Sequence, residues 1–173
     1  MIRLRVVRVA CGVLMLAGLA GANRAAAQEI GLPIGAVVPP VTVEDLDGAP
    51  VDLGQWIGKQ PVLIEFWATW CPNCAALFPR MEVARRRFGS TVEFIVVAVG
   101  VNQSPRSIKR HLEKHPMPFT VLWDARGRAV RAFDALTTSY VVLLDAAGRV
   151  VYTGVGSDQD LESALAPVVG PER

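Results

Sequence analysis

Residues 66–74 read Phe-Trp-Ala-Thr-Trp-Cys-Pro-Asn-Cys, and they follow directly on the apolar run Val62-Leu63-Ile64. This stretch places two cysteines, Cys71 and Cys74, where a buried strand is expected to turn into a helix. Pro72 suits the first position of that helix, because its missing N–H and fixed φ carry no penalty there. We therefore expect Cys71 to be an exposed N-cap and Cys74 to lie one turn in, facing the protein.

A thiol at the start of a helix is chemically activated. The first backbone N–H groups of a helix have no partner within it, and the helix dipole places partial positive charge there, so a thiolate is stabilised. The motif Cys71-Pro72-Asn73-Cys74 therefore predicts redox chemistry with Cys71 as the attacking thiol. Trp70, directly before Cys71, is a candidate for the wall of a substrate groove.

The first 27 residues have the pattern of a secretory signal peptide. Three arginines form a basic segment, residues 9–22 are apolar or small, and Ala25-Ala26-Ala27 forms a small-residue cleavage site. The apolar part is short for a membrane span, which needs about 20 residues. We expect residues 1–27 to be removed on export to the periplasm, and residues 28–173 to form one domain without stable membrane insertion. An uncleaved anchor is the alternative.

Removal of this segment changes the charge and the cysteine content. The chain has 18 Lys and Arg and 16 Asp and Glu, but residues 1–27 hold four arginines and no acid, which leaves 14 basic against 16 acidic residues and a net charge of −2. No basic patch therefore suggests a nucleic-acid partner. Only Cys71 and Cys74 remain, and one closely spaced pair gains little as a structural crosslink.

Apolar periodicity and turn signals predict alternating strands and helices. We expect a hairpin over 41–52, strands at 62–67, 94–101, 119–123, 140–144 and 150–153, and helices at 72–88, 104–114, 128–133 and 157–168. The last helix is expected to open with a capping box at Ser157-Asp158-Gln159-Asp160. This order indicates an α/β thioredoxin fold, a central mixed β-sheet flanked by helices on both faces, with an N-terminal β-hairpin extension.

From about residue 35 to 169 the chain resembles the TlpA/ResA-type thioredoxin-like (redoxin) family, which are exported thiol–disulfide oxidoreductases. Residues 66–74 carry the resemblance, together with the less specific hairpins 43–48 and 142–150. The resemblance implies a disulfide-containing protein substrate. A reductase in an oxidising periplasm would need a membrane thiol electron donor, and we expect no cofactor or metal. Family members of this kind serve cytochrome c maturation or other metalloprotein assembly.

Glu65 is the only charged residue in the predicted central strand. It falls where typical thioredoxins have a buried aspartate and where many members of the resembled family have asparagine. Burial raises the pKa of a carboxyl group, so Glu65 could take the proton of Cys74 as that sulfur attacks a mixed disulfide. The alternative is a solvated glutamate at the edge of the sheet.

The loop Thr138-Ser139 falls at the position of the family's cis-proline, which packs opposite the dithiol. No proline occurs between Pro118 and Pro167, so no shift of register restores it. A cis bond before a residue other than proline costs about 2.5–4 kcal/mol, so we expect a trans bond, or a cis bond held by strong tertiary constraint. In the family this loop presents backbone to substrate and shields the sulfurs from metal, and the loss of proline bears on both.

Three other kinds of site compete for the cysteine pair. A zinc site would need His111 and His115, but 36 residues separate Cys74 from His111, and both histidines are expected to point away from the dithiol as solvated residues late in their helix. A copper-binding metallochaperone without enzymatic activity is the main alternative, since thiolates select Cu(I). A peroxiredoxin motif is absent, because Ile64 and Ala68 stand at the required positions.

The sequence therefore predicts a periplasmic thiol–disulfide oxidoreductase. The dipeptide Pro72-Asn73 adds no charge next to the sulfur of Cys71, and a base beneath Cys74 suits reduction of a substrate, so we expect a protein disulfide reductase. The direction of electron flow depends on the reduction potential of the pair, and the sequence names no client protein.

Overall fold

The structure is a computed structural model, and it describes residues 30–170. The predicted signal peptide lies outside these residues. The elements, in chain order, are β1 (Thr42–Glu44), β2 (Pro50–Asp52), the 3₁₀ helix η1 (Leu53–Gln55), β3 (Val62–Trp67), α1 (Pro72–Phe88), β4 (Glu93–Val99), α2 (Pro105–Lys114), β5 (Thr120–Asp124), α3 (Arg128–Ala132), β6 (Tyr140–Leu144), β7 (Val150–Val155) and α4 (Leu161–Val169). No helix within the described residues is long and apolar enough to cross a membrane.

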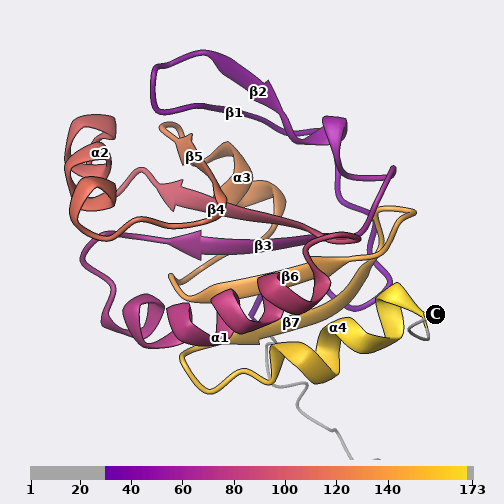
Figure 1. Ribbon diagram of the computed structural model, residues 1–173. Coiled ribbons are helices and arrows are strands. Elements are labelled where there is room, and N and C mark those ends of the chain that lie inside the picture. Colours follow the sequence, from indigo (N-terminus) through magenta and orange to yellow (C-terminus); the bar gives the residue numbers. More distant parts are fainter. Residues whose placement is uncertain (1–29, 171–173) are drawn as a thin grey trace, which may run out of the picture.

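All of these strands join one sheet in the order β2-β1-β5-β4-β3-β6-β7 (Figure 1). Strands β3, β4 and β5 run parallel, and β6 and β7 continue the sheet in antiparallel fashion. The β1–β2 hairpin extends the opposite edge through an antiparallel pairing with β5. This mixed sheet with an N-terminal hairpin confirms the predicted thioredoxin fold.

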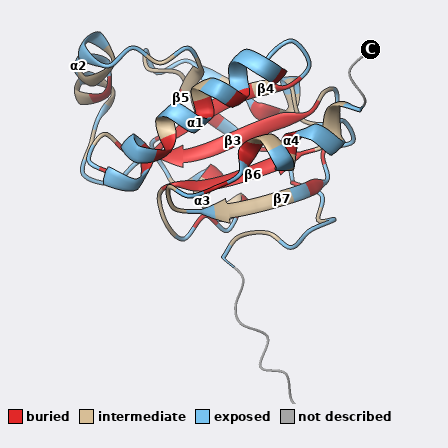
Figure 2. Cartoon of the chain, turned by 60° about the horizontal axis from the view of Figure 1, so that its bottom comes forward, coloured by how far each residue is buried: buried red, intermediate tan, exposed pale blue. Residues whose placement is uncertain are grey.

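Helices cover both faces of the sheet and divide the core into two layers. One layer packs α1 and α4 against the sheet through buried apolar residues, namely Leu63, Leu77, Met81, Val141, Leu143, Leu161 and Leu165. The other layer packs η1, α2 and α3 against the opposite face, through residues that include Leu53, Ile64, Phe66, Ile108, Ala129 and Val142. Figure 2 shows the central strands β3 and β6 buried throughout, as the continuous apolar runs predict.

Three predicted boundaries are wrong by two residues or more, the first being the end of strand β7, which continues to Val155 rather than ending at residue 153. Strand β4 ends at Val99 rather than at residue 101. The last helix begins at Leu161, with Asp160 as the N-cap whose side chain accepts a hydrogen bond from the Ser163 amide. Ser157 does not open this helix, because the segment before Asp160 turns Gln159 into the protein to bond other backbone groups. The capping pattern at Ser157 stands one turn before the start of the helix, so it gives no indication that Gln159 is buried.

Candidate active site

Cys71 is the N-cap of α1, as predicted, and Pro72 occupies the first helical turn. Cys71 and Cys74 form a disulfide with their Cα atoms 5.3 Å apart. The Cys74 amide also donates a hydrogen bond to Cys71 Sγ over 3.1 Å. The sulfur of Cys71 therefore lies against an otherwise unpaired N–H at the positive end of a 17-residue helix, which is the geometry that stabilises a thiolate once the disulfide opens.

The prediction that Cys71 is exposed is wrong for this disulfide-bonded state. Cys71 is 6 % exposed and Cys74 is 1 % exposed. The two sulfurs are bonded to each other, and both cysteines line a cavity, so little of Cys71 reaches open solvent. Asn73, between them, is exposed, as is Trp70 at 47 %.

The backbone just before the motif is held by one glutamine that the sequence did not single out. Gln103, after β4, accepts a hydrogen bond from the Thr69 amide over 2.9 Å and donates to the Val99 carbonyl over 2.8 Å. It also makes a longer 3.4 Å bond to the Trp67 carbonyl. Nearby, the Trp70 indole N–H donates to the Val101 carbonyl over 2.9 Å, so the exposed ring is fixed at its polar end.

Glu65 lies inside the protein, on the face of the sheet that α1 covers. It pairs across the sheet with Val141, whose side chain packs in the same layer as Leu77 and Met81 of α1. Glu65 is 3 % exposed, and its Oε1 atom is buried without a hydrogen-bond partner in the described residues. Burial raises the pKa of Glu65 to about 8. The expectation of a buried carboxyl group is therefore confirmed, and such a group is mostly protonated at neutral pH.

The loop at the cis-proline position takes a different form. None of the peptide bonds in residues 30–170 is cis, so the Thr138–Ser139 bond is trans, as expected. Ser139 is fully buried and adopts a φ of 57°, in the left-handed region. Its amide donates to the Phe66 carbonyl over 2.8 Å, and its hydroxyl donates to the Gly156 carbonyl over 3.0 Å. Proline has no N–H and a φ near −65°, so it fits neither feature.

A second glutamine completes this loop. Gln159 is buried, and its amide nitrogen donates to the Ser139 carbonyl over 3.1 Å and to the Gly156 carbonyl over 2.8 Å. Its amide oxygen accepts a hydrogen bond from the Tyr152 hydroxyl over 3.1 Å. Thr138, just before Ser139, is partly exposed.

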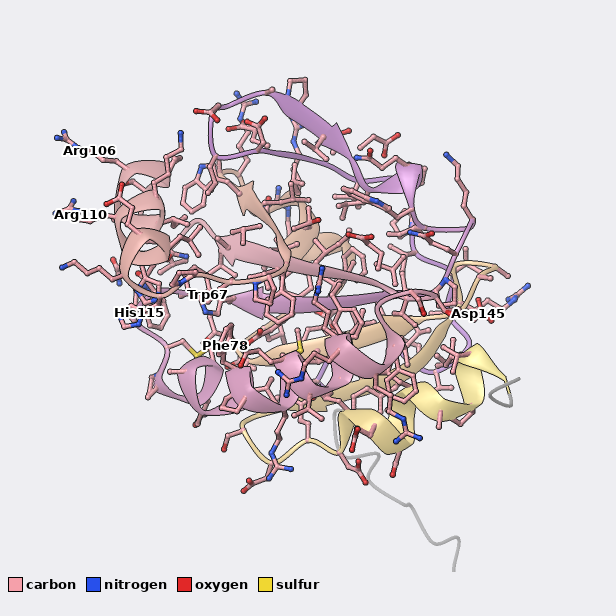
Figure 3. The ribbon with its side chains drawn as sticks, viewed as in Figure 1. Trp67, Phe78, Arg106, Arg110, His115 and Asp145 are labelled. Atoms are coloured by element: carbon pink, nitrogen blue, oxygen red, sulfur yellow. A yellow bond between two sulfur atoms is a disulfide. The ribbon has the colours of Figure 1, made fainter. Side chains whose placement is uncertain are left out.

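A cavity of about 470 Å³ opens beside the disulfide. Its walls are formed by Trp67, Ala68, Thr69, Cys71, Cys74, Ala75, Phe78, His111, His115, Pro116 and Met117. Figure 3 shows Trp67, Phe78 and His115 at this end of the molecule, where the last turn of α2 comes down beside the start of α1. The cavity is mostly apolar, and it is continuous with the atoms that would react.

The expected direction of the two histidines is wrong. The ring of His111 packs edge-on against Trp67 with 5.3 Å between ring centroids, and the rings of His111 and His115 lie 4.7 Å apart. Helix α2 crosses the end of the sheet instead of running back along it, so its last turn, not its first, lies beside the cysteines (Figure 1). Burial, with a smaller effect from His115, lowers the pKa of His111 below its usual value.

Within residues 30–170 no group of three or more His, Cys, Asp or Glu side chains is arranged to hold a metal ion. What the site holds instead is a disulfide at a helix start, a buried carboxyl group and an apolar cavity. A thioredoxin fold with a Cys-x-x-Cys disulfide at the N-cap of its first helix is that of a thiol–disulfide oxidoreductase.

Comparison with known proteins agrees with this class. The family model described as Redoxin matches residues 33–167, so the chain belongs to the Redoxin family. It is 30% identical over 124 residues to the thiol-disulfide oxidoreductase ResA of Bacillus subtilis, a match that covers 71% of this chain and 68% of that protein. The resemblance to TlpA/ResA-type proteins is confirmed.

Solved structures share the fold. The thioredoxin domain of a thiol-disulfide oxidoreductase from Bacteroides vulgatus superposes with a TM-score of 0.69 at 22% identity, covering 80% of this chain and 99% of that one. A secreted disulfide oxidoreductase from Mycobacterium tuberculosis gives a TM-score of 0.60 at 24% identity, covering 72% and 91%.

Proposed function

We propose that this protein is an exported protein disulfide reductase of the periplasm, with Cys71 as the attacking thiol and Cys74 as the resolving thiol. The observation that carries the proposal is the disulfide at the N-cap of α1 in a Redoxin-family domain. The signal-peptide pattern of residues 1–27 supports export, as does the secreted relative of known structure.

The reaction begins from the reduced dithiol. The Cys71 thiolate attacks one sulfur of a client disulfide, which forms a mixed disulfide and releases the other client sulfur as a thiolate. Cys74 then loses its proton and attacks Cys71 Sγ, which forms the Cys71–Cys74 disulfide and releases the second client thiolate. Two electrons have passed to the client, whose two thiolates take their protons from solvent, and a membrane thiol donor must return two electrons to the pair.

Glu65 supplies the proton-transfer group for Cys74 in this proposal. When ionised it accepts the proton that Cys74 loses as it attacks the mixed disulfide. When a donor thiolate later attacks Cys71, protonated Glu65 returns a proton to the Cys74 sulfur that leaves. Because burial raises the pKa of Glu65 to about 8, the ionised fraction and hence the resolving step should increase with pH up to about that value.

The test is turnover with a disulfide-bonded protein such as insulin, with a chemical dithiol as electron donor. We expect the wild type to reduce the client catalytically, and Cys71→Ala to lose at least about a thousandfold in rate. Cys74→Ser should form a mixed disulfide with the client that it cannot resolve, visible on a gel without reductant. Equal turnover by the wild type and Cys71→Ala would overturn the proposal.

A further inference from the structure

The cavity beside the disulfide is larger than the exchange of two sulfurs requires. At about 470 Å³ it is within the range of about 300–1,000 Å³ that holds small molecules or large side chains. Five of its walls are apolar carbon or sulfur surfaces from three separate segments, namely Trp67, Ala75, Phe78, Pro116 and Met117. A side chain that entered this space would bury apolar surface on all of them.

The position of the cavity beside the cysteines indicates that such a side chain belongs to the client polypeptide. Cys71 and Cys74 line the same space, so any client whose sulfur bonds to Cys71 has its neighbouring residues at the mouth of the cavity. The cavity is therefore continuous with the surface on which the client must lie in the proposed reaction, and the chain that fills it is the client itself.

The exposed side of α2, next to the cavity, carries positive charge. Helix α2 contributes the cavity residues His111 and His115, and next to them in sequence stand Arg110 and Lys114. With Arg106 one turn earlier, these three residues are exposed at spacings of four residues along the helix. Figure 3 shows Arg106 and Arg110 on the outer side of α2, pointing away from Trp67 and Phe78. No ion pair of these three is present among the described residues, whereas Lys109 on the same helix pairs with Asp47.

Carboxylates near the cavity are few, although the negative end of the α2 dipole also lies here. None of the cavity residues is acidic, and Glu113 is the only carboxylate on α2. The positive end of the α1 dipole points toward the same space. The protein without its first 27 residues carries a net charge of −2, so the positive charge on α2 is a local feature and not a sign of a basic protein. Charge complementarity then favours acidic residues in whatever chain lies across it.

We propose that the cavity between α1 and α2 is a specificity pocket for the client polypeptide, and that it takes a large apolar side chain beside the client's disulfide cysteine while acidic residues farther along the client contact Arg106, Arg110 and Lys114. The proposal rests on the proposed function, because it requires Cys71 to bond to a client sulfur. It adds the class of client: apolar next to the cysteine and acidic beyond it.

The test uses four synthetic peptides, each with one cysteine joined by a disulfide to a thionitrobenzoate reporter. The residue beside the cysteine is Phe or Ala, and a pair beyond it is Glu or Lys. We expect the reduced protein to react with the Phe–Glu peptide about tenfold or more faster than with the Ala–Lys peptide. Raising the salt concentration should remove the preference for Glu and leave the preference for Phe.

Single-residue variants test separately the preference for Phe over Ala and the preference for Glu over Lys. Phe78→Ala should remove most of the preference for Phe over Ala, and Met117→Ala, on a separate segment, should reduce it as well. Arg110→Glu should abolish or reverse the preference for Glu, an effect of about two- to fivefold. Arg86→Glu is the matched control, because this arginine lies in the last turn of α1 at the far end from the cysteines, and it should leave both preferences unchanged.

The outcomes separate the two proposals. Glutathione disulfide has neither an apolar side chain nor an acidic pair at the required place, so it reports the dithiol alone. If glutathione disulfide and all four peptides react and the peptides do so at equal rates, or the Lys peptides react faster, the specificity pocket is overturned and the oxidoreductase stands. If neither the peptides nor glutathione disulfide react, the proposed function fails, and the pocket fails with it.

Discussion

The two loops at the reactive end of the sheet are built in opposite ways. The start of α1 is specified by local residues, namely the N-cap Cys71 and the proline that follows it, while Gln103 bonds the backbone just before it. The loop that contains Ser139 is specified by distant partners, because its bonds go to Phe66, Gly156 and Gln159. Local chemistry fixes the reacting groups, and tertiary bonds fix the surface that faces them.

The two loops nonetheless share one device, a glutamine that bonds several backbone groups. Gln103 ties the Thr69 amide to the end of β4 on the side of the cysteines. Gln159 ties the Ser139 and Gly156 carbonyls on the other side. Both loops are therefore fixed by hydrogen bonds to distant residues. They differ because the reacting residue Cys71 is itself the N-cap that starts α1, whereas no reacting residue fixes the Ser139 loop.

Replacing the buried carboxyl group gives the largest expected effect on the cysteine side. Because the pKa of Glu65 is about 8 in the folded protein and near 4.5 in an unfolded chain, the unfolded chain loses this proton first as pH rises. The free energy of unfolding should therefore fall between about pH 4.5 and pH 8 by on the order of 3–5 kcal/mol and level off above that. In Glu65→Gln this contribution to the pH dependence should be absent.

Denaturant unfolding of the oxidised protein at several pH values measures this effect. Glu93→Gln on β4 is a suitable control, because Glu93 is only partly buried and should leave the slope in place. Stopped-flow rates of resolution provide a second reading: the wild-type rate should increase with pH up to about 8, and the variant rate should not. If Glu65→Gln and the wild type had the same pH–rate profile, Glu65 would have no role in proton transfer.

Introducing a proline at Ser139, the position at which the family resemblance implies a cis-proline, gives the next effect, on the other loop. Ser139→Pro removes the N–H that bonds to Phe66 and cannot adopt a φ of 57°, so we expect a loss of about 3 kcal/mol or more in unfolding free energy. Ser139→Gly keeps the N–H and tolerates positive φ, so it should cost about 1 kcal/mol or less. Full stability and activity in Ser139→Pro would mean that the loop can adopt a second conformation without the Ser139–Phe66 bond, and that its tertiary hydrogen bonds do not fix its shape.

The smallest effects should come from the two glutamines, and these test the comparison most finely. Gln103→Met and Gln159→Met each keep the side-chain volume and remove several backbone hydrogen bonds, at a cost of about 1–3 kcal/mol each. We expect Gln103→Met to change the pKa or reactivity of Cys71, measured by alkylation rate against pH. Gln159→Met should leave that alkylation profile unchanged and slow the reaction with a protein client. Equal effects of both variants on alkylation would show that the loops are not separable.

Much of the fold was predictable because its signals are local. The all-apolar strands β3 and β6, the helix α1 with its N-cap, and the Asp45–Gly48 turn all have the bounds or position that the sequence predicts. The burial of Glu65 was predictable for the same reason, since a lone charge in an otherwise apolar central strand has nowhere else to lie.

The errors occur where one element bonds to another far along the chain. The histidines of α2 were placed away from the cysteines, because a helix axis cannot be oriented from its sequence alone; the crossing of α2 over the sheet end depends on packing around Trp67 and Ile108. Gln103, Phe78 and Met117 carry no local signal. The local signal at Gln159 is misleading, because the segment Ser157-Asp158-Gln159-Asp160 resembles the start of a helix.

The reduction potential of the Cys71–Cys74 couple tests the central proposal most directly. Equilibration of the protein with glutathione or a dithiol buffer, followed by separation of the oxidised and reduced forms, gives this value. A protein disulfide reductase should have a potential below about −220 mV, on the side of thioredoxin. A potential near −120 mV, like that of a strong oxidant, would contradict the proposed direction of electron flow.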